Sequence, residues 1–184
     1  MRCGAITSPS WRSPSWRRWR GSSGTVCPGR RVPGTMTPTQ DEWKAALSRR
    51  FTAFVEAYER GSLEAMSELF WHDDDIVVVG THSNLHFRGW EQVEHSFRTQ
   101  FGSLRDIRVT LRSEQLWHGG APPSTMACLT VPAMDIALVA GGRPVTFEGI
   151  RVTCAFERRG AEWRMVQLHW SLPRTEVLVD HKYR

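Results

Sequence analysis

The sequence lacks long hydrophobic runs, has few cysteines and contains no cofactor-binding motif. No segment approaches the roughly 18 consecutive apolar residues of a membrane-spanning helix, which excludes a transmembrane protein. Four cysteines without a Cys-x-x-Cys pair exclude a disulfide scaffold and a zinc knuckle. A Gly-rich phosphate loop and a Gly-x-Ser-x-Gly motif are also missing. With 184 residues, 40% of them hydrophobic, we predict one soluble, cytoplasmic domain that uses no cofactor or metal and has no membrane partner.

Acidic residues are absent from the first 35 positions, which hold seven of the 24 Lys and Arg residues. The rest of the chain carries 17 basic against 19 acidic residues, so it offers no basic face and we predict no nucleic-acid partner. Residues 1–35 are rich in Ser, Gly, Pro and Trp, which predicts disorder. Two interpretations remain: a basic arm for nucleic acid or anionic membrane, or a true translation start at Met36. We favour the start at Met36, because a helix signal begins immediately after it.

Residues 36–175 form the predicted domain, followed by a C-terminal tail over 176–184. Thr37 and Pro38 suit the N-cap and first position of a helix. Helical spacing then continues through Trp43, Ala46, Leu47, Phe51, Phe54, Val55 and Tyr58. Gly61 is expected to end this helix and Ser62 to cap a short second one. A third helix is predicted after Gly89.

Alternating apolar residues predict strands over 76–79, 85–87, 107–111, 125–140, 145–157 and 163–172. Pro132 interrupts the fourth of these and indicates an edge or a bulge. Gly141-Gly142 and Arg159-Gly160 indicate hairpin turns. Helices first and hairpin-linked strands afterwards predict an α+β fold with an antiparallel sheet.

Four segments resemble the SnoaL-like and ketosteroid-isomerase-like members of the nuclear-transport-factor-2-like superfamily. They are FVEAYERGSLEAMSELF, DDDIVVVG, FRGWEQVEHSF and EWRMVQLHWSLP, and the resemblance covers about residues 38–175. It implies a cone-shaped, curved antiparallel sheet packed against three helices of the N-terminal half. It also implies a homodimer, and a small, largely apolar ligand in the cone.

The resemblance does not extend to the residues of ketosteroid isomerase chemistry. Those enzymes use a tyrosine on the first helix, where this sequence has Phe54, and a carboxylate base where it has Val78 and Val79. Without both groups, we do not expect that particular proton abstraction. His82 and His86 fall in a turn and a strand, so no metal site is predicted from them.

Strand alternation suggests another set of pocket residues. Gln167, His169 and Ser171 share one face of the last strand with Met165, and Arg151 and Thr153 share one face of the strand before it with Phe147. We predict His169 as the catalytic base, with a binding set of Arg151, Gln167, Ser171, Thr153, Phe54 and Trp90. Arg151 would pair with a carboxylate or enolate of the ligand.

Two alternatives stay open for these residues. His169 could instead bond a backbone carbonyl while Arg151 bonds Glu148 or Glu157 at the surface. If the faces are inverted, Trp170, Leu168 and Val166 line a wholly apolar cone. The function is accordingly predicted as binding of a small apolar or carboxylate-bearing molecule, with proton-transfer chemistry of an isomerase, cyclase or dehydratase type. The rival is a non-catalytic dimerisation or ligand-binding module whose cone is filled by its own aromatic residues, and a basic-tailed nucleic-acid binder is a third class.

Overall fold

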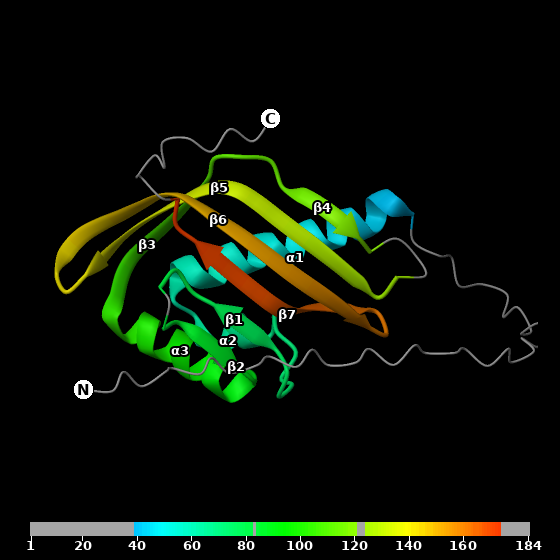
Figure 1. Cartoon of the computed structure of the whole chain (residues 1–184), viewed down its shortest axis with the longest axis horizontal. Coiled ribbons are helices and arrows are strands. Elements are labelled where there is room, and N and C mark those ends of the chain that lie inside the picture. Colours follow the sequence, from blue (N-terminus) through cyan, green and yellow to red (C-terminus); the bar gives the residue numbers. More distant parts are fainter. Residues whose placement is uncertain (1–38, 83, 121–123, 174–184) are drawn as a thin grey trace, which may run out of the picture. The chain divides into compact units, whose positions relative to one another are not determined.

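The computed structural model describes residues 39–82, 84–120 and 124–173 (Figure 1). Its helices and strands, in chain order, are α1 (Gln40–Arg60), α2 (Leu63–Ser67), β1 (Val77–Val79), β2 (His86–Arg88), α3 (Trp90–Ser103), β3 (Leu104–Leu111), β4 (Leu116–Gly119), β5 (Met126–Ala140), β6 (Arg143–Arg159) and β7 (Glu162–Ser171). No helix in these ranges is long and apolar enough to cross a membrane. The predictions for residues 1–35, for a start at Met36 and for 176–184 lie outside the described residues.

Helix α1 begins at a capping box. The Glu42 backbone N–H donates to Thr39 Oγ1 at 3.3 Å, and the Thr39 backbone N–H donates to Glu42 Oε2 at 2.6 Å. Each residue thus satisfies a backbone donor that the first turn leaves free. Thr37 and Pro38, predicted to start this helix, lie outside the described residues, and the cap is Thr39. Gly61, at φ +60°, ends α1 as predicted.

The strands form one curved sheet in the order β2-β1-β7-β6-β5-β3, with β4 paired to β5. All pairs are antiparallel except β1 with β7, where Val78 lies opposite Leu168. The α+β class is confirmed, although this parallel pair departs from the predicted antiparallel sheet. Strand β4 was not predicted, because four residues among polar neighbours carry little alternation.

The core lies between α1 and the concave face of the sheet. Leu129, Val152 and Leu168 on neighbouring strands are fully buried, as is Phe51 on the helix. Burial of such side chains stabilises each by about 1.5–3 kcal/mol relative to exposure. The sheet therefore closes over one side of α1.

Bulges bend the long strands. The β5–β6 register shifts around Pro132, which confirms the predicted irregularity there, and again at Asp135 opposite Gly149. Beyond this second bulge the β5–β6 hairpin continues to its turn at Gly141 and Gly142, both at positive φ. In Figure 1 the hairpin, yellow to orange, extends past the rest of the sheet at the end where α3 and β3 lie.

Candidate functional site

A cavity of about 540 Å³ opens at this end of the sheet. Its lining residues come mainly from the last turn of α1, one face of α3, the β1–β2 turn and the hairpin arm of β5 and β6. Figure 1 shows where these elements lie. Its volume falls within the roughly 300–1,000 Å³ of small-molecule sites in proteins. The cavity is therefore the candidate functional site.

One wall of the cavity is apolar. The hairpin arm contributes Ile136, Leu138, Ala140, Val145 and Phe147, and β6 contributes Ile150. Trp170 of β7 also lines the cavity, with its ring centroid 5.4 Å from that of Tyr58. These side chains favour an apolar ligand skeleton, because its transfer from water is favourable in proportion to the apolar area covered.

The opposite wall carries a chain of polar groups. Tyr58 Oη donates to Gln100 Oε1 at 3.2 Å, and Gln100 Nε2 donates to Ser96 Oγ at 3.1 Å. Residues 96 and 100 are one helical turn apart on α3, which places both side chains on the same face. Burial raises the pKa of Tyr58 to about 12, so its hydroxyl is neutral at physiological pH.

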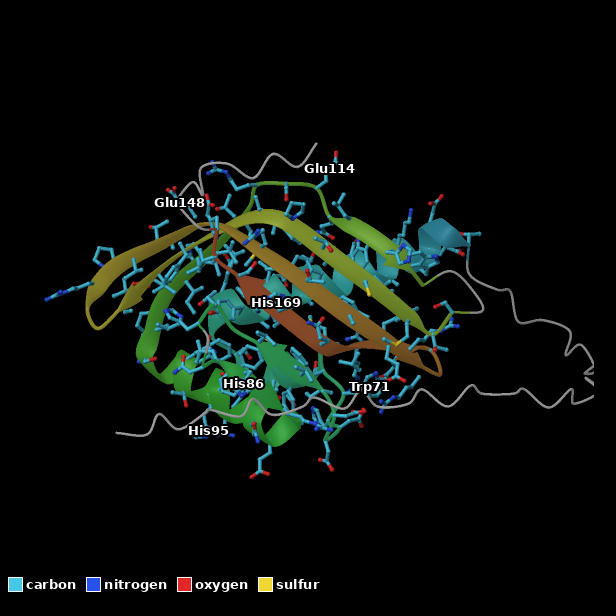
Figure 2. The ribbon with its side chains drawn as sticks, viewed as in Figure 1. Trp71, His86, His95, Glu114, Glu148 and His169 are labelled. Atoms are coloured by element: carbon cyan, nitrogen blue, oxygen red, sulfur yellow. The ribbon has the colours of Figure 1, made fainter. Side chains whose placement is uncertain are left out.

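Charged side chains are absent from the lining as far as the structure describes it. Its titratable members are Tyr58, His82 and His95. His82 Nδ1 lies 3.1 Å from Thr81 Oγ1, and His95 is exposed on α3 (Figure 2). The described ranges also contain no group of three His, Cys, Asp or Glu side chains arranged to hold a metal ion. The lining therefore suits an uncharged molecule.

The structure places the predicted catalytic residue outside the cavity. His169 is exposed on the face of β7 away from α1, while its neighbours Leu168 and Trp170 are buried (Figure 2). Gln167, Ser171, Arg151 and Thr153 are likewise absent from the cavity lining. The expectation that His169 faces the cone is wrong. Trp170 lines the cavity, as in the alternative with inverted faces, but Leu168 and Val166 are not in the lining.

A bulge in each strand accounts for the inverted faces. In β7, Met165 is buried as expected, but the register shifts between Met165 and Gln167, so that Leu168 rather than Gln167 or His169 points inward. In β6, Phe147 lines the cavity, but the bulge at Gly149 leaves Arg151 and Thr153 on the outer face. An extra residue reverses the alternation of every side chain after it.

Several of the predicted site residues are neighbours on that outer face. Thr153 lies opposite His169, and Arg151 lies opposite Ser171. Arg151 Nη2 donates to the Leu172 carbonyl at 3.2 Å instead of pairing with Glu148 or Glu157. The sequence thus predicted the right pair of strands, but it predicted the wrong face of the sheet for these side chains.

The predicted aromatic residues also lie outside the cavity. Phe54 is buried behind it, 6.0 Å from the Trp170 ring, and Trp90 stacks on His72 at 4.3 Å. Trp71 lies near the other end of the sheet, where the guanidinium groups of Arg159 and Arg164 approach its ring at 4.6 and 4.7 Å (Figure 2). The protein's own aromatic side chains thus fill the deep part of the cone but leave the mouth open.

Sequence reasoning missed Ser96 and Gln100 of the polar wall and preferred Phe54 to Tyr58 as the pocket residue of α1. Tyr58 follows Phe54 by one turn on the same stripe of α1, and its place at the helix end brings it to the mouth. Ser96 and Gln100 flank the apolar stripe of Phe97 and Phe101 at i, i+4 spacing. That polar pair beside an apolar stripe was the available signal.

The fold and the cavity define an α+β protein whose curved sheet and helices enclose a small-molecule-sized pocket. The profile of the SnoaL-like domain family matches residues 47–175, and the chain belongs to this family. None of the curated proteins matches the chain significantly.

Solved structures share the fold at low sequence identity. A protein of the nuclear transport factor 2-like superfamily from Salmonella enterica superposes with a TM-score of 0.68 at 16% identity, covering 78% of this chain and 100% of its own. A cystatin-like protein from Caulobacter vibrioides gives 0.60 at 22%, covering 73% and 92%. A protein of the same superfamily from Streptomyces avermitilis, provisionally named a dehydratase, gives 0.58 at 21%, covering 73% and 99%. These likenesses establish the fold.

Proposed function

We propose that this protein binds a small, uncharged, largely apolar molecule in the cavity at the mouth of the cone. The observation that carries the proposal is the lining itself: it combines an apolar wall on the β5–β6 arm with a hydrogen-bonded set of Tyr58, Gln100 and Ser96. Such a combination binds an apolar skeleton and orients it by a few polar contacts. A charged ligand is disfavoured, because the described lining contains no Asp, Glu, Lys or Arg side chain to offset its desolvation.

A filled cavity tests this proposal. Val145 lines the cavity, whereas the next residue, Thr146, is exposed on the outer face of the same strand. We expect Val145→Trp to weaken binding of apolar probes by about tenfold or more, because the indole occupies the volume that a ligand needs. Thr146→Trp adds the same group outside and should leave binding unchanged.

The measurement is a thermal-shift screen of uncharged aromatic compounds, followed by calorimetric titration of those that raise the melting temperature. Binding that is lost in Val145→Trp and kept in Thr146→Trp supports the proposal. Compounds that bind both variants equally well would place the site elsewhere and contradict it.

Proton transfer on the bound molecule is the second candidate function. One observation favours it: His82 and His95 line the cavity, and histidine is the side chain that most often serves as a general acid or base. Turnover of a compound that binds in the cavity, detected by a product, separates this candidate from binding alone.

A further inference from the structure

The direction of the hydrogen bonds in the polar chain decides which ligand group fits. A tyrosine hydroxyl has one hydrogen to donate and lone pairs to accept with. In this structure Tyr58 Oη gives that hydrogen to Gln100 Oε1. What remains available on Tyr58 for a ligand is therefore an acceptor.

The amide of Gln100 holds this direction. Its Nε2 donates to Ser96 Oγ, and no acceptor for the Ser96 hydroxyl hydrogen is found within the described ranges. Rotating the amide by half a turn would exchange the roles: Ser96 would donate to Gln100, and the Tyr58 hydrogen would lose its acceptor. The two arrangements contain the same number of hydrogen bonds within the chain.

Burial favours the observed arrangement. Tyr58 is only 6% exposed, whereas Ser96 is half-buried. A donor left without a partner costs more when it is shielded from water than when water can reach it. The hydroxyl hydrogen without an acceptor is therefore that of Ser96, and the Tyr58 oxygen presents its lone pairs to the cavity.

We propose that the ligand of this cavity carries an alcohol or phenol hydroxyl that donates to Tyr58 Oη, and that a carbonyl oxygen is the poorer partner at this position. The inference rests on the proposed function, since it concerns the same cavity. A carbonyl placed against Tyr58 Oη would bring lone pairs against lone pairs as long as Tyr58 donates to Gln100.

Three probes of similar size test the proposal by calorimetry at neutral pH: 4-phenylphenol, 4-methoxybiphenyl and 4-phenylcyclohexanone. They present a hydroxyl, an ether and a carbonyl group on comparable apolar skeletons. We expect the wild-type protein to bind the phenol about tenfold more tightly than the other two, the size of one well-formed neutral hydrogen bond. The three affinities are compared within one protein, so a lower fraction of folded protein in a variant does not change their ratios.

Two variants change what position 58 can offer a ligand: one removes the acceptor, and the other frees the donor. Tyr58→Phe removes the acceptor, so the preference for the phenol should disappear while binding of the ether persists. Gln100→Met frees the Tyr58 hydrogen, so the ketone should gain about tenfold relative to its affinity for the wild type. Ser103→Ala changes a serine of α3 that lies outside the lining and should leave all ratios unchanged.

The possible failures are distinguishable. Equal or tighter binding of the ketone by the wild type, with loss of all binding in Val145→Trp, would overturn the hydroxyl preference and leave the proposed function standing. The hydroxyl preference alone would also be overturned if Gln100→Met melted like the wild type but did not raise the affinity for the ketone. No Val145-dependent binding of any probe would overturn the proposed function and this inference together.

Discussion

Two adjacent residues, His169 and Trp170, decide the chemical character of the cone. Trp170 is buried, with its ring 6.0 Å from that of Phe54 and 5.4 Å from that of Tyr58, while His169 is exposed on the other face of β7. A strand presents successive side chains to opposite faces, so one of the two had to lie inside. Because Trp170 lies inside, the cone contains its indole ring and not the imidazole of His169 that was predicted as the base.

At the residue scale we expect unequal effects of removing these two side chains. Trp170→Ala should lower the free energy of unfolding by about 3–5 kcal/mol, since it empties a packed aromatic cluster. His169→Ala should change it by less than about 1 kcal/mol and leave ligand affinity unchanged. Denaturant unfolding and calorimetry measure both. A loss of binding in a fully folded His169→Ala protein would contradict this assignment of faces.

The β5–β6 hairpin is the element that shapes the cavity. Its bend lies where the Gly149 N–H donates to Asp135 Oδ1 at 3.0 Å, and Asp135 Oδ2 also pairs with Arg112 at 2.8 Å. Gly149 has φ +66°, a backbone conformation that residues with a Cβ rarely adopt. Beyond this bend the arm places Ile136 and Val145 against the cavity.

At the element scale we predict that Asp135 holds the arm in place. Asp135→Ala leaves the Gly149 N–H without its acceptor and should cost about 1–3 kcal/mol of stability while weakening ligand binding. Asp135→Asn keeps an amide oxygen for Gly149 and loses only an ion pair to a largely exposed arginine, so both effects should be small. Chemical unfolding and probe titration check this, and equal behaviour of the two variants would show that the bend does not depend on this bond.

The outer face of the sheet is a second surface, separate from the cavity. Residues other than Asp, Glu, Lys and Arg form its centre on four neighbouring strands, among them Val79, His169, Thr153 and Cys128. A broad face without charge at its centre is typical of subunit interfaces. Together with the family resemblance, this supports the predicted homodimer as a proposal.

At the scale of the whole molecule we expect a dimer that packs through this face. Light scattering after size exclusion should give twice the 21.0 kDa mass of the chain. Thr153→Arg places a charge at the centre of the face and should yield monomers, because an unpaired charge is costly to bury. Thr146→Arg, out on the hairpin arm, should remain dimeric. A wild-type protein that runs as a monomer at high concentration would refute the proposal.

The sequence by itself determined the helices, most strands, both hairpin turns and the family, because caps, glycine turns and apolar periods are local signals. It also placed β6 and β7 side by side, since a tight hairpin joins strands that pair with each other. Only the tertiary structure decided which face of β6 and β7 turns inward. That choice depends on bulges at Gly149 and next to Val166, and a bulge forms through pairing with a distant strand. The polar wall of Tyr58, Gln100 and Ser96 has the same origin: α1 and α3 meet through contacts that no local pattern records.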